Sequence, residues 1–141
     1  MTWKIPIRFE SFAGHRLPTV ELEIRLAGSD AKAIFPALVD TGSSVSLMPR
    51  GLLKQEGFPV AESKSEGRAV VGIGGAARTW VLERAVFVLR DADGALAPFN
   101  QERLFLAAGR FPPILGRGFL RQTNARLSVD FVDEEGFLEI G

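Results

Sequence analysis

Apolar and polar residues alternate along most of this chain, and that pattern restricts it to a mainly β fold. The alternation is clearest over residues 3–9, 20–26 and 126–131, where every second side chain is apolar. Continuous apolar runs over 34–39 and 85–89 are typical of strands buried on both faces. We therefore expect a structure built from strands, with few helices.

Short turn signals separate the expected strands. Gly28-Ser29-Asp30 predicts a hairpin between the strands on either side of it, and Asp133-Glu134-Glu135-Gly136 predicts another near the end of the chain. Residues 90–101 contain Asp, Gly, Pro and Asn, and they predict a long hairpin loop. Helical signals are confined to short segments at about 49–55 and 117–122.

Length and composition predict one globular domain over residues 1–141. Hydrophobic residues make up 46% of the chain and charged residues 24%, which is not the composition of a disordered protein. Basic and acidic residues both number 17, so no net charge attracts nucleic acid or an anionic membrane, and we expect neither as a partner. With no cysteine and one histidine, we also expect no metal and no cofactor.

The N-terminal residues alternate like a strand and lack the apolar centre of a signal peptide. No segment approaches the roughly 18 consecutive apolar residues of a membrane-spanning helix. The expected location is therefore cytoplasmic.

The segment Asp40-Thr41-Gly42-Ser43 follows the apolar run 34–39 and places a carboxylate on a tight turn at a strand end. Such turns are common, and a match of this length can arise by chance. Gly42 lets the turn fold tightly, and the hydroxyls of Thr41 and Ser43 can orient the carboxylate. Peptide hydrolysis without a metal or a Ser or Cys nucleophile needs one carboxylate to activate water and a second acid to polarise the carbonyl group. The motif occurs once, so it supplies half of such a site.

The glycine-rich segment Gly72-Ile73-Gly74-Gly75 has three interpretations. It can be the tip of an ordinary β-hairpin or of a hairpin that closes over a substrate, because glycine permits the backbone changes that closing requires. With Ala77 it also fits the dinucleotide-binding pattern G-x-G-x-x-A. Residues 79–88 are rich in β-branched and aromatic side chains, and no helix N-cap precedes them. A hairpin fits better than a phosphate-binding loop.

A third motif, Ile114-Leu115-Gly116-Arg117, is by itself a buried strand that ends in a turn. The order of the three motifs is more informative than any one of them. A strand with Asp-Thr-Gly-Ser, then a glycine-rich hairpin tip, then Ile-Leu-Gly with a short helix, resembles the retropepsin-like aspartic proteases over residues 34–122. The clan includes the retroviral protease and ubiquitin-receptor and bacterial members.

The resemblance implies a closed, β-barrel-like acid-protease fold with one or two short helices. It also implies a homodimer in which two Asp40 residues, one from each subunit, face each other across a two-fold axis. Between them they would activate a water molecule that hydrolyses a peptide or protein substrate. The implied function is that of a homodimeric aspartic endopeptidase.

The resemblance assigns roles to individual residues. The implied catalytic residue is Asp40, and its loop is supported by Thr41, Gly42 and Ser43, with Thr41 interlocking with its mate across the axis. The implied flap, which binds substrate, is formed by Gly72, Ile73, Gly74 and Gly75. Subsite or packing roles fall to Val45, Ile114, Leu115, Gly116 and Arg117.

Two features depart from the retroviral enzyme. The arginine that matches Arg117 pairs there with an acid four residues beyond the catalytic Asp, whereas this chain has Ser44 at that position. The chain also continues past the expected helix into a C-terminal hairpin, which looks more like the ubiquitin-receptor type. The alternative function is a non-catalytic dimeric module of the same fold that binds extended peptides or regulates other proteins.

Overall fold

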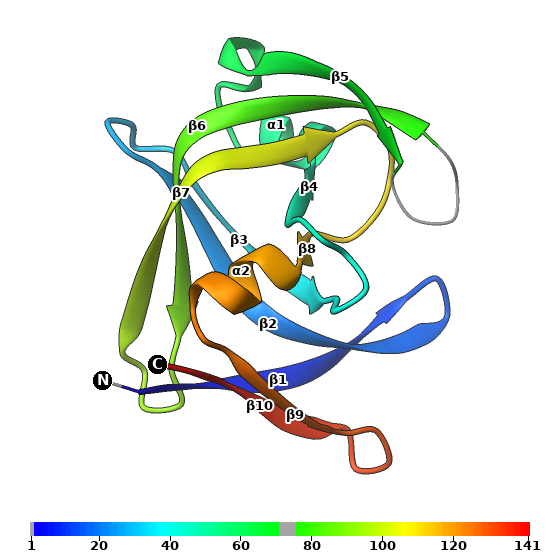
Figure 1. Ribbon diagram of the computed structural model, residues 1–141, viewed down its shortest axis with the longest axis vertical. Coiled ribbons are helices and arrows are strands. Elements are labelled where there is room, and N and C mark those ends of the chain that lie inside the picture. Colours follow the sequence, from blue (N-terminus) through cyan, green and yellow to red (C-terminus); the bar gives the residue numbers. More distant parts are fainter. Residues whose placement is uncertain (1, 71–75) are drawn as a thin grey trace.

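Figure 1 shows the chain as a computed structural model that describes residues 2–70 and 76–141. Strands make up most of these residues. The strands are β1 Trp3–Phe12, β2 His15–Leu26, β3 Lys32–Val39, β4 Leu47–Pro49, β5 Lys64–Val70, β6 Ala76–Arg90, β7 Leu96–Ala107, β8 Ile114–Leu115, β9 Arg126–Asp130 and β10 Glu135–Ile140. The helices are α1 Arg50–Gln55, the 3-10 helix η1 Val60–Glu62 and α2 Arg117–Gln122.

The strands form one sheet whose middle part closes on itself. Their order is β5-β6-β7-β4-β8-β3-β2-β1-β10-β9, and β2 also pairs with β6 from Leu22↔Leu89 to Leu26↔Ala85. That extra pairing makes a ring of strands. In Figure 1, β6 and β7 curve over the top of the view, and β1, β9 and β10 form a layer at the bottom. The predicted mainly β architecture is confirmed.

Burial along β3 differs from the expectation. The apolar run 34–39 predicted a strand buried on both faces, but Phe35, Ala37 and Val39 are buried while Ile34 is 53% exposed. The reason is that one face of β3 packs on the core and the other does not. The second apolar run, 85–89, is buried at all but one position, as predicted.

The long loop predicted over 90–101 is wrong. β6 and β7 pair from Arg90↔Leu96 to Thr79↔Ala107, which leaves only a turn at 91–95. Pro98 does not break the strand, because β4 pairs with β7 only at 105–107 and residue 98 has β6 as its neighbour. Proline is tolerated where one edge of a strand needs no N–H donor.

Both short helices form where the sequence predicts them. Pro49 precedes α1, which ends before Gly57 at a φ of +84°, a backbone conformation that suits glycine. Leu53 of α1 and Phe119 of α2 are buried and join the hydrophobic core. No helix among the described residues is long and apolar enough to cross a membrane.

The hairpins at 28–30 and 133–136 are confirmed by the antiparallel pairs β2–β3 and β9–β10. β5 and β6 also pair antiparallel, from Lys64↔Val81 to Val70↔Ala76. Because residue 76 opens a strand rather than a helix, the dinucleotide-binding interpretation is wrong. The tip of this hairpin, where the flap residues 72–75 were expected, lies outside the described residues.

Candidate active site

Asp40 follows β3 directly, and β8 holds the backbone that leads up to it. The two strands are parallel, with Leu38 opposite Ile114 and Val39 opposite Leu115. The Asp40 N–H donates a hydrogen bond to the Leu115 carbonyl oxygen at 3.0 Å. The carboxylate is therefore held at the end of a strand that belongs to the core.

The residues after Asp40 fold back onto its side chain. We name residues 40–46 the Asp40 loop. The Gly42 N–H donates to Asp40 Oδ1 at 2.9 Å, and the Ser43 N–H donates to the Asp40 carbonyl oxygen at 3.2 Å. The Ser43 hydroxyl donates to the Val45 carbonyl oxygen at 2.7 Å. One carboxylate oxygen is thus oriented, while Asp40 Oδ2 accepts no hydrogen bond from the described residues.

The residues of the Asp40 loop differ in how far they are exposed. Asp40 and Ser43 are half-buried, whereas Thr41, Gly42 and Ser44 are exposed. The loop therefore presents the Asp40 carboxylate and the neighbouring Thr41 hydroxyl near the surface of a single chain.

Gly116 packs against the back of the Asp40 loop. A Cβ atom at this position would lie 2.3 Å from the Val45 carbonyl oxygen and 2.8 Å from that of Ser43, so no side chain fits. The Gly116 N–H also donates to Ser46 Oγ at 3.0 Å. Sequence reasoning did not single out Ser46, since a serine beyond the motif carries no pattern of its own.

The first residues of α2 hold the other side of the Asp40 loop through their backbone. The Arg117 N–H donates to the Ser43 carbonyl oxygen at 2.7 Å, and the Gly118 N–H donates to that of Ser44 at 3.1 Å. The Arg117 side chain is exposed, and the side chains that the structure describes offer it no ion pair. Main-chain hydrogen bonds therefore support the loop, at the place where Ser44 offers Arg117 no carboxylate.

The residues expected to form subsites differ in position. Val45 is 40% exposed and Ile114 is half-buried, so both can contact a ligand, but Leu115 is fully buried and serves packing alone. The structure brings Asp40, Ser43, Val45 and Gly116 together. The predicted flap residues Gly72, Ile73, Gly74 and Gly75 are not described, so their relation to Asp40 stays a prediction.

Asp40 is the one carboxylate that the described residues provide at this site. Among the described residues, no group of three or more His, Asp or Glu side chains could hold a metal ion, and Asp40 forms no ion pair. Acid–base chemistry at this loop therefore needs a second acid from elsewhere.

Solved structures with a similar fold include two proteases. A retropepsin-like aspartic protease from Rickettsia conorii is similar with a TM-score of 0.58 and 14% identity, over 99% of this chain and 93% of that chain. EIAV protease, complexed with the inhibitor HBY-793, is similar with a TM-score of 0.52 and 18% identity, over 85% of this chain and 100% of that chain. No protein-family model matches the sequence, and no curated protein does. At these identities the likeness shows the fold alone: the chain has a retropepsin-like fold.

Proposed function

We propose that this protein is an aspartic endopeptidase that acts as a homodimer, with Asp40 of each subunit in one shared active site. The observation that carries the proposal is the Asp40 loop itself. In a retropepsin-like fold, the loop holds one carboxylate oxygen of Asp40 on the Gly42 N–H and leaves the carboxylate half-exposed. Gly116 and the start of α2 brace that loop from behind.

The chemistry needs two carboxyl groups that share one proton. Two carboxyl groups about 3 Å apart cannot both be ionised, because the two negative charges repel each other. Aspartic proteases are the standard example of such a pair. The ionised Asp40 takes a proton from a water molecule, whose oxygen bonds to the carbonyl carbon of the substrate, and the protonated Asp40 gives its proton to the carbonyl oxygen. The Asp40 that took the proton from water then gives it to the nitrogen, and the other Asp40 takes a proton back from a hydroxyl group of the tetrahedral intermediate. The C=O bond re-forms, the C–N bond breaks, and the amine leaves. No covalent bond to the enzyme forms.

Substrate recognition follows from the surroundings of the Asp40 loop. Val45 within the loop and Ile114 on β8 offer apolar surface, which favours apolar side chains next to the cleaved bond. We expect residues 72–75 to cover the substrate and exclude bulk water, as glycine-rich hairpin tips allow.

Cleavage of an unbiased peptide library over a range of pH tests the proposal. The wild-type protein should cut peptides, and Asp40→Asn should abolish the activity because an amide cannot take a proton from water. The matched control is Asp30→Asn, an exposed aspartate in the β2–β3 turn, which should cleave like the wild type. Equal cleavage by wild type and Asp40→Asn would contradict the proposal. Peptide binding without cleavage by either protein would instead support the non-catalytic peptide-binding module.

A further inference from the structure

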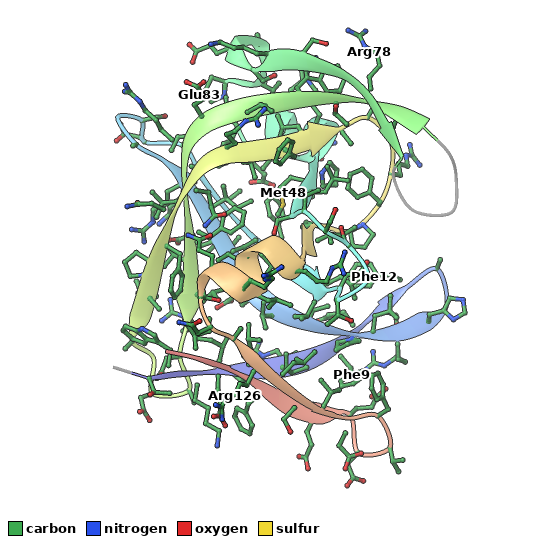
Figure 2. All side chains as sticks on the ribbon, in the orientation of Figure 1. Phe9, Phe12, Met48, Arg78, Glu83 and Arg126 are labelled. Atoms are coloured by element: carbon green, nitrogen blue, oxygen red, sulfur yellow. The ribbon has the colours of Figure 1, made fainter. Side chains whose placement is uncertain are left out.

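A pocket of about 640 Å³ lies at the corner where β6 leaves β2. The two strands pair as far as Leu26↔Ala85, and the N–H of Ala27 then donates to the Arg84 carbonyl oxygen at 2.9 Å. Figure 2 labels Glu83, the residue before Arg84, near this corner. We name this space the corner pocket. Its lining includes Ala27, Arg84, Val86, Asn100, Gln101 and Arg103.

Arg84 has a backbone conformation that suits glycine better than arginine. Its φ is +63°, in the left-handed region, where a side chain is strained. The register of β6 with β7 pairs Glu83 with Arg103 and Ala85 with Gln101, and it passes over Arg84. Glycine at this position would relieve the strain. A strained arginine beside a pocket therefore points to a use for its side chain.

The corner pocket carries more positive than negative charge. Arg84 is exposed, and its guanidinium makes no ion pair with the described residues. Arg103 brings a second guanidinium, which lies 5.2 Å from the centroid of the Phe105 ring. Among the described side chains of the lining, the one carboxylate is that of Glu83, and it lies 3.8 Å from Lys64 Nζ. This arrangement suits an oxyanion, because a guanidinium can donate two parallel hydrogen bonds to a carboxylate or a phosphate.

Two amide side chains add neutral groups to the same lining. The Asn100 side chain is exposed and makes no hydrogen bond with the described residues, so its N–H groups can donate to a ligand. Gln101 Nε2 donates to the Asn100 carbonyl oxygen at 2.9 Å and to Gln122 Oε1 at 3.0 Å. These hydrogen bonds hold Gln101 in place at the edge of the pocket.

The corner pocket continues into a smaller pocket beside the Asp40 loop. The smaller pocket has a volume of about 130 Å³, and Ser44 and Val45 of the loop belong to its lining. Gln101 and Arg103 line both pockets. One depression therefore leads from the Asp40 loop across β7 to Arg84. An extended peptide that contacts the loop could place a side chain several residues away beside Arg84.

We propose that the corner pocket binds the carboxylate of an acidic side chain on a peptide whose other residues contact the Asp40 loop. The inference rests on the proposed function only in that a peptide occupies this site, whether it is cleaved or merely bound. It names the substrate class: peptides with Asp or Glu several residues from the position at the loop. Arg84 is then a specificity-determining residue.

Peptide binding to an Asp40→Asn protein tests the inference, because bound peptides then stay whole if Asp40 is catalytic. A library of randomised peptides retained on this protein should be enriched in Asp or Glu at one position. In an enriched peptide, replacing the acid by its amide should weaken binding at least about tenfold, since a charge-assisted hydrogen bond is lost. Adding Arg84→Gly should weaken binding of the acidic peptide equally and leave that of the amide peptide unchanged.

Three further variants serve as controls in the same background. Arg84→Asn is uncharged and tolerates the left-handed region, so it repeats the test if the glycine variant is unstable. Arg84→Lys keeps the charge and should retain part of the affinity. Arg8→Ala removes an exposed arginine of β1 that lines neither pocket, and it should bind the acidic peptide like its parent. A library without acidic enrichment, or an equal loss in Arg8→Ala and Arg84→Gly, would overturn the inference.

Inorganic phosphate distinguishes a peptide carboxylate from a free anion. It should compete with the acidic peptide, because both need the Arg84 guanidinium. Phosphate binding that depends on Arg84, without acidic enrichment among the peptides, would mark a site for free anions and contradict the inference. The outcome is separate from catalysis. Equal cleavage by wild type and Asp40→Asn would remove the proposed function and leave Arg84-dependent binding standing. Cleavage that needs Asp40 but is indifferent to Arg84 would do the reverse.

Discussion

Gly116 is the residue at which backbone packing constrains the candidate site most tightly. The Cβ of Gly116→Ala would lie 2.5 Å from the Val45 carbonyl carbon and 2.8 Å from the Ser43 carbonyl oxygen. Both are backbone atoms, which cannot rotate away as a flexible side chain can. We expect the substitution to displace the Asp40 loop, to lower the free energy of unfolding by about 1–3 kcal/mol, and to reduce peptide cleavage. Urea denaturation and the cleavage assay measure the two effects.

The control for Gly116→Ala is Gly51→Ala. Gly51 lies in α1, and a Cβ there meets nothing within 4 Å. Because alanine favours a helix by up to about 1 kcal/mol over glycine, this variant should be as stable as the wild type or more so. Equal stability of the two glycine variants would show that Gly116 is not confined as the structure has it.

Ser46 is expected to stabilise the same contact through a hydrogen bond. Ser46→Ala leaves the Gly116 N–H, which is buried, without its acceptor, and we expect a loss of about 1–3 kcal/mol in unfolding free energy. Ser44→Ala is the matched control, since the Ser44 side chain is exposed and makes no hydrogen bond with the described residues. Urea denaturation should give the two variants free energies of unfolding that differ by more than the error of the method.

The Asp130 carboxylate makes the stability of the fold depend on pH, through the turn after β9. The N–H groups of Asp133 and Val132 donate to Asp130 Oδ1 and lower the pKa of this carboxyl group. A carboxylate with a lowered pKa stabilises the fold fully above its unfolded pKa of about 3.9 and loses that effect as the pH falls through the folded value. Asp130→Asn cannot titrate.

The melting temperature of the wild type should therefore exceed that of Asp130→Asn at pH 6, and the gap should narrow toward pH 3. Thermal unfolding at one low protein concentration measures it, with Asp30→Asn as the control. A gap that is constant or widens as the pH falls would contradict the assignment.

Residues of the site were predictable where chain geometry demands one residue type. Gly42 and Gly116 belong to motifs with a tight turn and a close approach, and at Gly116 the structure leaves no room for a side chain. Ser46 was not predictable, because a serine that accepts one N–H from a residue far along the chain leaves no local pattern. Thr41 is exposed, and its implied contact with the Thr41 of a second subunit stays a prediction.

At the scale of elements, α2 connects the Asp40 loop to the core through Phe119. This side chain is 3% exposed, and its ring centroid lies 5.6 Å from those of Phe87 and Phe99. We expect Phe119→Ala to cost about 3–5 kcal/mol in unfolding free energy, because it removes a buried aromatic side chain and leaves a cavity. Activity should fall with stability, since the first residues of α2 hold the loop.

The control on the same helix is Arg121→Ala. Arg121 is exposed, and a surface substitution of this kind should change the unfolding free energy by no more than about 0.5 kcal/mol. Chemical denaturation compares both variants with the wild type. A cost for Phe119→Ala as small as that for Arg121→Ala would mean that α2 does not pack through this residue.

Elements with a local signal were predicted well, and those set by distant partners were not. α2 has the bounds that the sequence indicates, because Gly116 precedes it and Asn124, at a φ of +50°, follows it. The start of β7 was missed, since Asp91, Asp93, Gly94 and Pro98 look like a loop unless the pairing with β6 is known. For the same reason the exposed face of β3 was not apparent from its apolar run.

At the scale of the whole molecule, the closure of the sheet was expected only through the resemblance. The pairing of β2 with β6 joins strands separated by much of the chain, and alternation alone cannot say which strands become neighbours. The same limit applies to β9, whose place at the end of the sheet follows only from the pairing of the strands.

A shared active site makes a quantitative prediction about mixed dimers. When wild type and Asp40→Asn are combined in equal amounts and allowed to exchange subunits, about one quarter of the dimers carry two Asp40 residues. Because one carboxylate activates water and the other polarises the carbonyl group, only those dimers should cleave peptides. Activity at constant total protein should therefore fall to about one quarter of the wild-type value, with native mass spectrometry confirming exchange. A site contained within one chain would retain about one half instead, because each wild-type subunit would act alone.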